Sequence, residues 1–219
     1  MSDYIKFLPS YLIKKYQKWK QTKYQDNKSW FNKIAIEGQN PKSMIVSCCD
    51  SRIHVTSIFG ADKGEFFIHR NIANLIPPYN PNGDHHGTSA ALEYAVKILK
   101  VSNLIIMGHS RCGGINSGYH LCKKNNIPKQ KTIFIDKWLN ILKPAFENVL
   151  NENKTIEDDQ GIALLEKESI KTSLKNLIEF PFIKDSLEKN ELTLHGIWHD
   201  ISSGNIESLD PVSLNFIKI

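Results

Sequence analysis

The stretch Met44-Ile45-Val46-Ser47-Cys48-Cys49-Asp50-Ser51-Arg52 joins a short apolar run to a polar turn. A second stretch has the same design, with Leu104-Ile105-Ile106-Met107 running into Gly108-His109-Ser110-Arg111-Cys112-Gly113-Gly114. Short apolar runs bounded by turn residues are typical of buried strands. Both turns therefore follow strand ends, which is where open α/β sheets place their ligands.

The order of elements around these two stretches favours an α/β fold. We expect a central, mainly parallel β-sheet flanked by helices, with an N-terminal helical arm and a C-terminal β-hairpin. Strands are expected to end at residue 48 and to cover 65–70 and 103–108, and the hairpin is expected to join 192–200 to 205–209. Helices are expected over 55–59, from a Thr88 or Ser89 cap to 100, and over 114–123, 131–151 and 160–179. We interpret residues 1–219 as one domain with an arm, 1–38, and an α/β core, 39–219.

Composition limits the class of protein. Hydrophobic residues make up 41% of the 219 residues and charged residues 23%, as in ordinary globular proteins. No apolar run approaches the roughly 18 residues of a membrane span, and the first residues lack a signal-peptide pattern. Four cysteines, two of them adjacent, do not suggest a disulfide framework, so a cytoplasmic location is expected.

The net charge of +5 comes largely from lysines in the arm. Residues 1–42 contain nine Lys and no Arg, interleaved with aromatic and aliphatic residues at near-helical spacing. This pattern favours amphipathic helices over nucleic-acid binding, because Lys cannot make the bidentate contacts of Arg. The three Arg of the chain, at 52, 70 and 111, all lie in or between the two motif stretches.

Three side chains of the two turns form a candidate metal site. Cys48, His109 and Cys112 offer the sulfur and nitrogen donors that zinc prefers, and three protein ligands leave a fourth position open. Cys49 is expected to be a small packed residue, because the side chains of neighbouring residues on an extended chain point to opposite sides. Cys122 is expected to be a buried free thiol.

Cys48-x-Asp50-x-Arg52 together with His109-x-x-Cys112 resembles the β-class carbonic anhydrases. The similarity runs from about residue 39 to 118 and includes Gly64 to Asn74 and Glu93-Tyr94-Ala95-Val96, with an echo at 194–198. The resemblance implies one Zn²⁺ per subunit and reversible hydration of CO2 by zinc-bound hydroxide. It also implies a homo-oligomer, at least a dimer, with N-terminal helices reaching over the neighbour. From the composition, we expect no nucleic-acid or membrane partner.

The resemblance implies roles for residues around the metal. Asp50 would accept a hydrogen bond from the hydroxide while Arg52 keeps its carboxylate off the zinc. The substrate pocket is expected to include Gln39, Phe67, His85 and Gly113, and the nearest equivalent of a tyrosine that the family has in this pocket is His85 or His86. Arg70 matches an arginine of an inhibitory bicarbonate site whose other residues are replaced here, so we expect it to anchor the loop or the dimer.

Three alternatives remain from the sequence. The same scaffold and metal would serve a hydrolase of carbon disulfide or carbonyl sulfide. A non-catalytic zinc- or bicarbonate-binding protein would not need Asp50 and Arg52. A redox role for Cys48 and Cys49 is disfavoured, because adjacent cysteines form a disulfide only with strain.

Overall fold

The computed structural model describes residues 4–123 and 132–219, and its chain forms two compact units, Met1–Asn40 and Pro41–Ile219. The first unit contains α1 (Ser10–Trp19), a π-helical turn (Lys20–Tyr24) and α2 (Lys28–Glu37). Neither α1 nor α2 buries any residue. The arm is broken near residue 27, because Asn27 precedes α2 with non-helical backbone angles.

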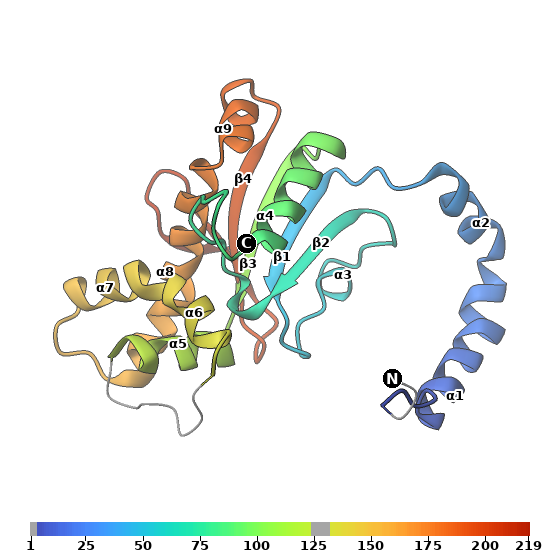
Figure 1. Ribbon diagram of the computed structural model, residues 1–219, viewed down its shortest axis with the longest axis horizontal. Coiled ribbons are helices and arrows are strands. Elements are labelled where there is room, and N and C mark those ends of the chain that lie inside the picture. The colour runs from blue at the N-terminus through green and yellow to red at the C-terminus, as the bar shows by residue number, and fades with distance from the viewer. Residues whose placement is uncertain (1–3, 124–131) are drawn as a thin grey trace. The chain divides into compact units, whose positions relative to one another are not determined.

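The second unit is built on a six-stranded sheet in the order β2-β1-β3-β4-β5-β6 (Figure 1). The first four strands in this order are parallel, and the last two pair antiparallel. The predicted α/β fold with a mainly parallel sheet and a C-terminal hairpin is therefore confirmed. The strands are β1 (Ser43–Cys48), β2 (Phe66–Asn71), β3 (Asn103–His109), β4 (Thr193–His199), β5 (Ile206–Leu209) and β6 (Phe216–Lys218).

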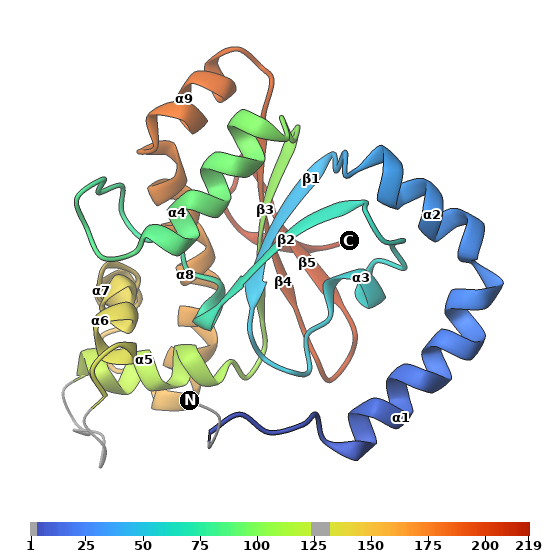
Figure 2. The same cartoon turned by 45° about the vertical axis from the view of Figure 1, so that its right-hand side comes forward.

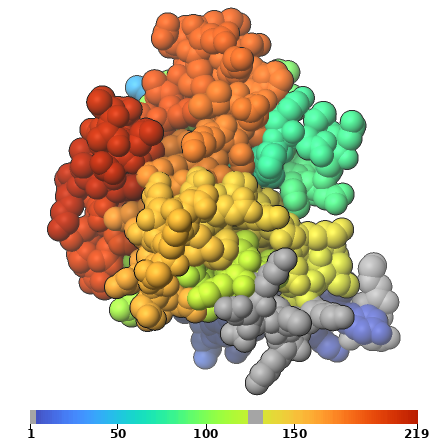
Figure 3. Space-filling model, turned by 90° about the vertical axis from the view of Figure 1, so that its left-hand side faces the viewer, coloured from blue at the N-terminus to red at the C-terminus, as the bar shows by residue number. Residues whose placement is uncertain are grey.

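Helices pack against the sheet, and Figure 2 shows α4 running alongside it. One core cluster joins the sheet to α4, α8 and α9, a second lies under α5 to α7, and a third packs around α3 and β5. Figure 3 shows the outer surface over α7 to α9, with the C-terminal strands in red beside it. The helices are α3 (Val55–Ile58), α4 (His86–Glu93), α5 (Gly113–Lys123), α6 (Ile135–Leu139), α7 (Lys143–Glu152), α8 (Asp158–Ile178) and α9 (Pro181–Glu188).

The predicted cap of α4 is wrong. The helix begins at His86 with no side-chain cap, so Thr88 lies inside its first turn. The Thr88 hydroxyl instead lies 3.1 Å from Nε2 of His69 in β2 and 3.4 Å from Nδ2 of Asn71. The Thr88 hydroxyl thus contacts side chains of the sheet and does not cap the helix, as the local sequence pattern had predicted it would. The helix then continues as a π-helical turn, Tyr94–Ile98.

Two glycines let α8 approach the sheet closely. A Cβ at Gly108 in β3 would lie 2.7 Å from Cδ1 of Ile170, and one at Gly196 in β4 would lie 2.9 Å from its Cγ2. Ile170 is fully buried in this contact. The position of α8 over β3 and β4 therefore depends on the absence of side chains at these two positions.

Candidate metal centre

The ends of β1 and β3 bring the two motifs together. The two strands are paired directly, with Ser47 of β1 opposite Met107 of β3. The ligand atoms of Cys48, His109 and Cys112 all lie within 4.8 Å of one another, and all three residues are buried. The three side chains that the sequence proposed as metal ligands are thus one cluster at the carboxyl edge of the sheet.

The geometry of the cluster fits tetrahedral zinc. The two sulfurs lie 3.8 Å apart, and two sulfurs each about 2.3 Å from a tetrahedral Zn²⁺ are about 3.8 Å apart. Nδ1 of His109 lies 2.9 Å from the Ser110 carbonyl oxygen, which makes Nδ1 the protonated nitrogen. Nε2 is buried and makes no hydrogen bond within the described residues, so its lone pair is available to a metal.

The two thiols also favour a cation. The pKa of Cys48 is lowered because Cys112 donates a hydrogen bond to its thiolate. The same contact and burial raise the pKa of Cys112. The pair therefore loses one proton readily and holds the second strongly, so a divalent cation is needed to stabilise both thiolates at neutral pH. Backbone N–H groups of Gly114 and Ile115, at the start of α5, partly stabilise the Cys112 thiolate.

Asp50 and Arg52 form a bidentate pair beside the cluster. Arg52 Nε donates to Asp50 Oδ1 at 2.9 Å, and one terminal nitrogen donates to Oδ2 at 2.6 Å. The Arg52 backbone N–H donates to Oδ1 as well. These hydrogen bonds hold the pKa of Asp50 well below its usual range. The carboxylate is therefore ionised and oriented by Arg52, as the sequence resemblance implied.

Arg52 also joins the two motif loops. The nitrogen that reaches Asp50 Oδ2 donates to the Arg111 carbonyl oxygen at 3.0 Å. Arg111 has a φ of 54°, in the left-handed region that costs a residue other than glycine about 1–2 kcal/mol. The arginine of the first loop is thus linked to the strained backbone turn between the ligands of the second loop.

Arg70 anchors the first loop, as predicted. Its Nε donates to the Cys48 carbonyl oxygen at 2.9 Å. One terminal nitrogen donates to the carbonyl oxygens of Asp50 and Ile53, at 2.8 and 2.9 Å. A single guanidinium in β2 therefore fixes the backbone that carries Cys48 and Asp50.

Glu166 is a residue of the site that the sequence reasoning missed. It lies in α8 with 4% of its surface exposed. Its Oε1 accepts the Cys112 backbone N–H at 3.1 Å, and its Oε2 accepts the Trp198 indole N–H at 3.3 Å. Burial raises the pKa of this carboxyl. The helical pattern held a signal, because Glu166 falls on the stripe of Ile162 and Ile170, at spacings of four residues.

The predicted pocket residues are distributed over several elements. Phe67 lies in β2 with its ring centroid 5.8 Å from that of Tyr94, and Gly113 is the first residue of α5. His85 instead contacts Trp138 edge to face, at 5.2 Å. Gln39 belongs to the first unit. Tyr94 is therefore a second candidate for the family's pocket tyrosine, and it lies within the stretch that carried the resemblance.

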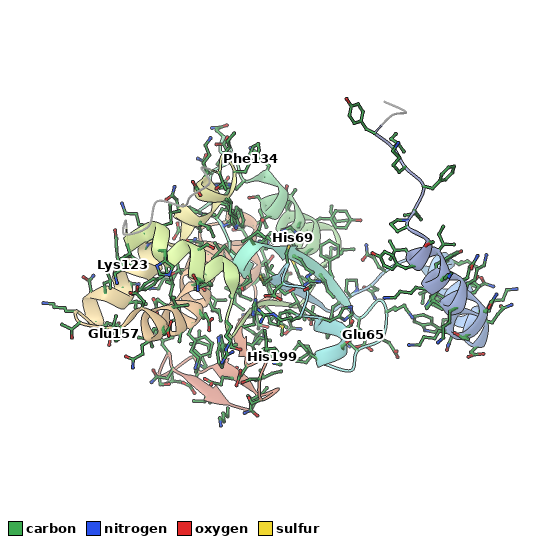
Figure 4. The ribbon with its side chains drawn as sticks, turned by 90° about the horizontal axis from the view of Figure 1, so that it is seen from below. Glu65, His69, Lys123, Phe134, Glu157 and His199 are labelled. Atoms are coloured by element: carbon green, nitrogen blue, oxygen red, sulfur yellow. The ribbon has the colours of Figure 1, made fainter. Side chains whose placement is uncertain are left out.

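The expectation that Cys49 is packed is wrong. Cys49 is exposed and lines a hollow of about 790 Å³ together with His69, His85 and Trp138. Cys49 follows the last residue of β1, and it is exposed whereas its neighbour Cys48 is buried. Figure 4 shows two residues that line the hollow, His69 from β2 and Phe134 from the segment before α6. Cys122, expected to be buried, is half-buried.

Comparison with known proteins gives one consistent result. A family model described as carbonic anhydrase matches residues 43–206. Beta carbonic anhydrase 3 of Arabidopsis thaliana is 36% identical over 189 residues, which cover 86% of this chain and 72% of that protein. The structure of the β-carbonic anhydrase CcaA has a TM-score of 0.87 and 29% identity, over 96% of this chain and 98% of CcaA. A structure from a study of two tetrameric β-carbonic anhydrases of Sordaria macrospora has a TM-score of 0.78 and 30% identity. The match covers 91% of this chain and 95% of the Sordaria macrospora chain.

Across residues 4–123 and 132–219, none of the helices is both long and apolar enough to cross a membrane.

Proposed function

Because this chain belongs to the β-carbonic anhydrase family, we propose that it catalyses the reversible hydration of CO2 to bicarbonate and a proton, with Zn²⁺ held by Cys48, His109 and Cys112. The observation that carries the proposal is the cluster of three buried ligand atoms within 4.8 Å beside an ionised carboxylate that Arg52 holds. Three protein ligands leave one coordination position for chemistry.

The chain's own residues prepare the metal centre. When bound, Zn²⁺ supplies a Lewis acid that makes water nucleophilic near neutral pH. Cys48 and Cys112 contribute two thiolates that balance the charge of the ion. The Ser110 carbonyl holds the His109 ring so that Nε2 faces the cluster. This orientation reduces the rearrangement that binding requires.

Asp50 orients the attacking water. Its low pKa keeps it an acceptor throughout the working range, so it can take a hydrogen bond from water and direct a lone pair toward the carbon of CO2. Arg52 satisfies both carboxylate oxygens and so prevents Asp50 from binding the metal itself. Because of this pair, Asp50 can orient the water without becoming a ligand of the metal.

Apolar and amide surfaces would receive the substrate. CO2 is linear and uncharged, which suits an aromatic surface such as the Phe67 and Tyr94 pair. The backbone N–H of Gly113, at the start of α5, can bind an oxygen that gains negative charge. We include Gln39 and His85 in the proposed pocket on the sequence resemblance.

We further propose that the protein works as a homo-oligomer of at least two subunits. The first unit exposes apolar side chains that a second copy could cover: Tyr11 is 59% exposed and Tyr16 is 53% exposed. The Sordaria macrospora relatives are tetramers by description. In a homo-oligomer, a second subunit would cover these exposed side chains of the arm.

Stopped-flow CO2 hydration, run beside zinc analysis on the purified protein, tests the proposed function. We expect about one zinc per chain, activity that is lost on chelation and restored by zinc, and a rate that climbs from neutral to alkaline pH. Zinc-loaded protein without hydration above the buffer background would overturn the proposal. Turnover of carbonyl sulfide or carbon disulfide in that preparation would identify the alternative hydrolase.

A further inference from the structure

Glu166 links three elements at the metal centre. It lies in α8 and accepts one hydrogen bond from the backbone of Cys112, before α5, and one from the side chain of Trp198 in β4. Both oxygens of the carboxylate are used, and the residue is 4% exposed. The backbone position of a ligand residue is therefore tied to the buried face of α8 and to the sheet.

The burial of this carboxylate has a cost that needs a reason. Within the described residues, no Lys or Arg forms an ion pair with Glu166; its neighbour Lys167 pairs with Glu207. Burying an unpaired carboxylate costs several kcal/mol before hydrogen bonds offset part of it, and an apolar residue of similar size commonly gives a more stable fold. Stability of the fold alone does not account for a glutamate here.

The hydrogen-bond partners select a carboxylate specifically. The Cys112 N–H and the Trp198 indole N–H are both donors and can accept nothing in return. Two acceptor oxygens on one planar group satisfy both. Glutamine has the same size but a single acceptor, so its amide N–H2 must face one of the two donors.

We propose that Glu166 is a positioning residue of the metal centre, which holds the Cys112 backbone so that its sulfur stays in coordination distance of the ion shared with Cys48. The inference rests on the proposed zinc role of Cys112. Cys112 directly precedes α5, and its sulfur lies 3.8 Å from that of Cys48. Loss of the carboxylate would free the backbone before α5 to shift and would weaken one of the two sulfur ligands.

The packing of α8 makes this link rigid. One turn after Glu166, Ile170 lies over Gly108 and Gly196 with no space for an added Cβ. The Ser169 hydroxyl donates to the Glu166 carbonyl oxygen at 2.9 Å. The position of α8 against β3 and β4 is thus fixed, and the Glu166 carboxylate holds the Cys112 backbone at a fixed distance from the helix.

Glu166→Gln is the first test, with Glu168→Gln as the matched control. Glu168 lies in the same helix, accepts from Asn148 Nδ2 at 3.0 Å and makes no described contact with the metal loops. We expect Glu166→Gln to weaken zinc binding about 10- to 100-fold in a chelator competition, in the range typical of outer-shell partners. Cobalt-substituted protein should also show a changed sulfur-to-cobalt charge-transfer band, and Glu168→Gln should change neither.

Trp198→Phe provides a rescue that a general packing defect would not show. In the double variant the glutamine oxygen can accept from Cys112, and its amide no longer faces the indole N–H. We therefore expect Glu166→Gln with Trp198→Phe to bind zinc more tightly than Glu166→Gln alone. If Glu166→Gln does not fold, Glu166→Asp replaces it: that side chain keeps the charge but is shorter by one methylene, and it should weaken zinc binding and change the cobalt band.

Two results would overturn the inference. The first is a zinc dissociation constant and a cobalt spectrum for Glu166→Gln, or for Glu166→Asp, that match those of Glu168→Gln. The second is a double variant that binds zinc no better than the single one. A wild-type protein that binds zinc but does not hydrate CO2 would refute the proposed function and leave this inference to be decided by the zinc measurements.

Discussion

At the scale of single residues, substitution of Arg52 should change turnover without changing metal binding. Arg52→Ala removes the bidentate partner of Asp50 but none of the three ligands, so zinc should stay at about one per chain. The freed carboxylate can then turn toward the metal, and CO2 hydration should fall about 10- to 100-fold. Metal analysis and stopped-flow assays measure the two effects.

Arg52→Lys is the comparison for this prediction. Lysine keeps the positive charge but cannot form the two parallel hydrogen bonds that Arg52 makes with Oδ1 and Oδ2 of Asp50. Its activity should lie between those of the wild type and Arg52→Ala. Full activity in Arg52→Ala would contradict the role of the pair.

His69 should contribute to the pH dependence of stability. Burial lowers its pKa in the folded protein, whereas the unfolded chain titrates near the ordinary value of about 6.5. The unfolded state therefore binds more protons at acidic pH. The folded protein is therefore destabilised by the titration of His69 as the pH falls below about 6.5, and this loss of unfolding free energy is absent above that pH.

Urea unfolding of the wild type and His69→Gln tests this sign. Glutamine can keep a hydrogen bond to Thr88 but does not titrate. Between roughly pH 7.5 and pH 5.5, the wild type should lose more unfolding free energy than His69→Gln. Equal losses in the two proteins would show that another group carries the pH dependence.

The ligands could be predicted from sequence, and some of their neighbours could not. Cys48, His109 and Cys112 follow apolar runs directly, so their places at strand ends could be inferred from local pattern. Glu166 and Tyr94 lie on helices, and their contacts depend on how those helices pack against the sheet. A single sequence contains the buried stripe of α8 but not the distance from that stripe to the Cys112 backbone.

At the scale of elements, the contact of α8 with the sheet should not tolerate a methyl group at position 108. The added Cβ of Gly108→Ala would lie 2.7 Å from Ile170 Cδ1, which we expect to cost about 1–3 kcal/mol of unfolding free energy. Ile170→Val removes that carbon atom. The double variant should therefore be more stable than the sum of the two single effects predicts.

Gly87→Ala is the control for this prediction. Gly87 lies in α4, and a Cβ there would meet nothing within 4 Å. This substitution should leave stability unchanged or raise it by up to about 1 kcal/mol through helix propensity. Thermal and urea unfolding report all four variants, and a Gly108→Ala protein as stable as Gly87→Ala would contradict the close contact.

Elements were predicted best where burial imposes their pattern. Strands β1 to β4 follow clear apolar runs and lie within one or two residues of their expected limits. α9 and β6 were not predicted, although Pro181 at the first turn of α9 is a recognised helix start. β6 has three residues and an exposed edge, so its alternation is too short to distinguish from a loop.

At the scale of the whole molecule, the first unit should matter more for assembly than for folding of the core. α1 and α2 bury no residue, whereas the second unit contains all three core clusters. Removal of residues 1–38 should therefore leave the circular dichroism of the core intact and reduce the assembly. Light scattering coupled to size-exclusion chromatography measures the mass of both proteins.

Lys14→Glu is a control for charge in that experiment, because Lys14 lies in α1 among the exposed residues. It should change the assembly less than removal of the arm if apolar side chains hold the subunits together. A truncated protein with the same number of subunits as the full chain would show that the arm has no part in assembly.

The parallel sheet could be inferred from the alternation of strands and helices, but the order of its strands could not. β1 pairs with both β2 and β3, and β4 adds to β3. The local sequence of β1 specifies burial on both sides and carries no information about which strand lies on which side. Only the packing of the complete chain fixes that order.

Arg70 has a consequence for how the first loop can change over evolution. Within the described residues, its hydrogen bonds go to the main-chain oxygens of Cys48, Asp50 and Ile53. Hydrogen bonds to carbonyl groups do not depend on the side chains between them, so positions 49 and 51 can be substituted while the course of the loop is retained. Laboratory evolution of the neighbouring hollow can therefore begin at Cys49, because a substitution there should leave the positions of the three metal ligands unchanged.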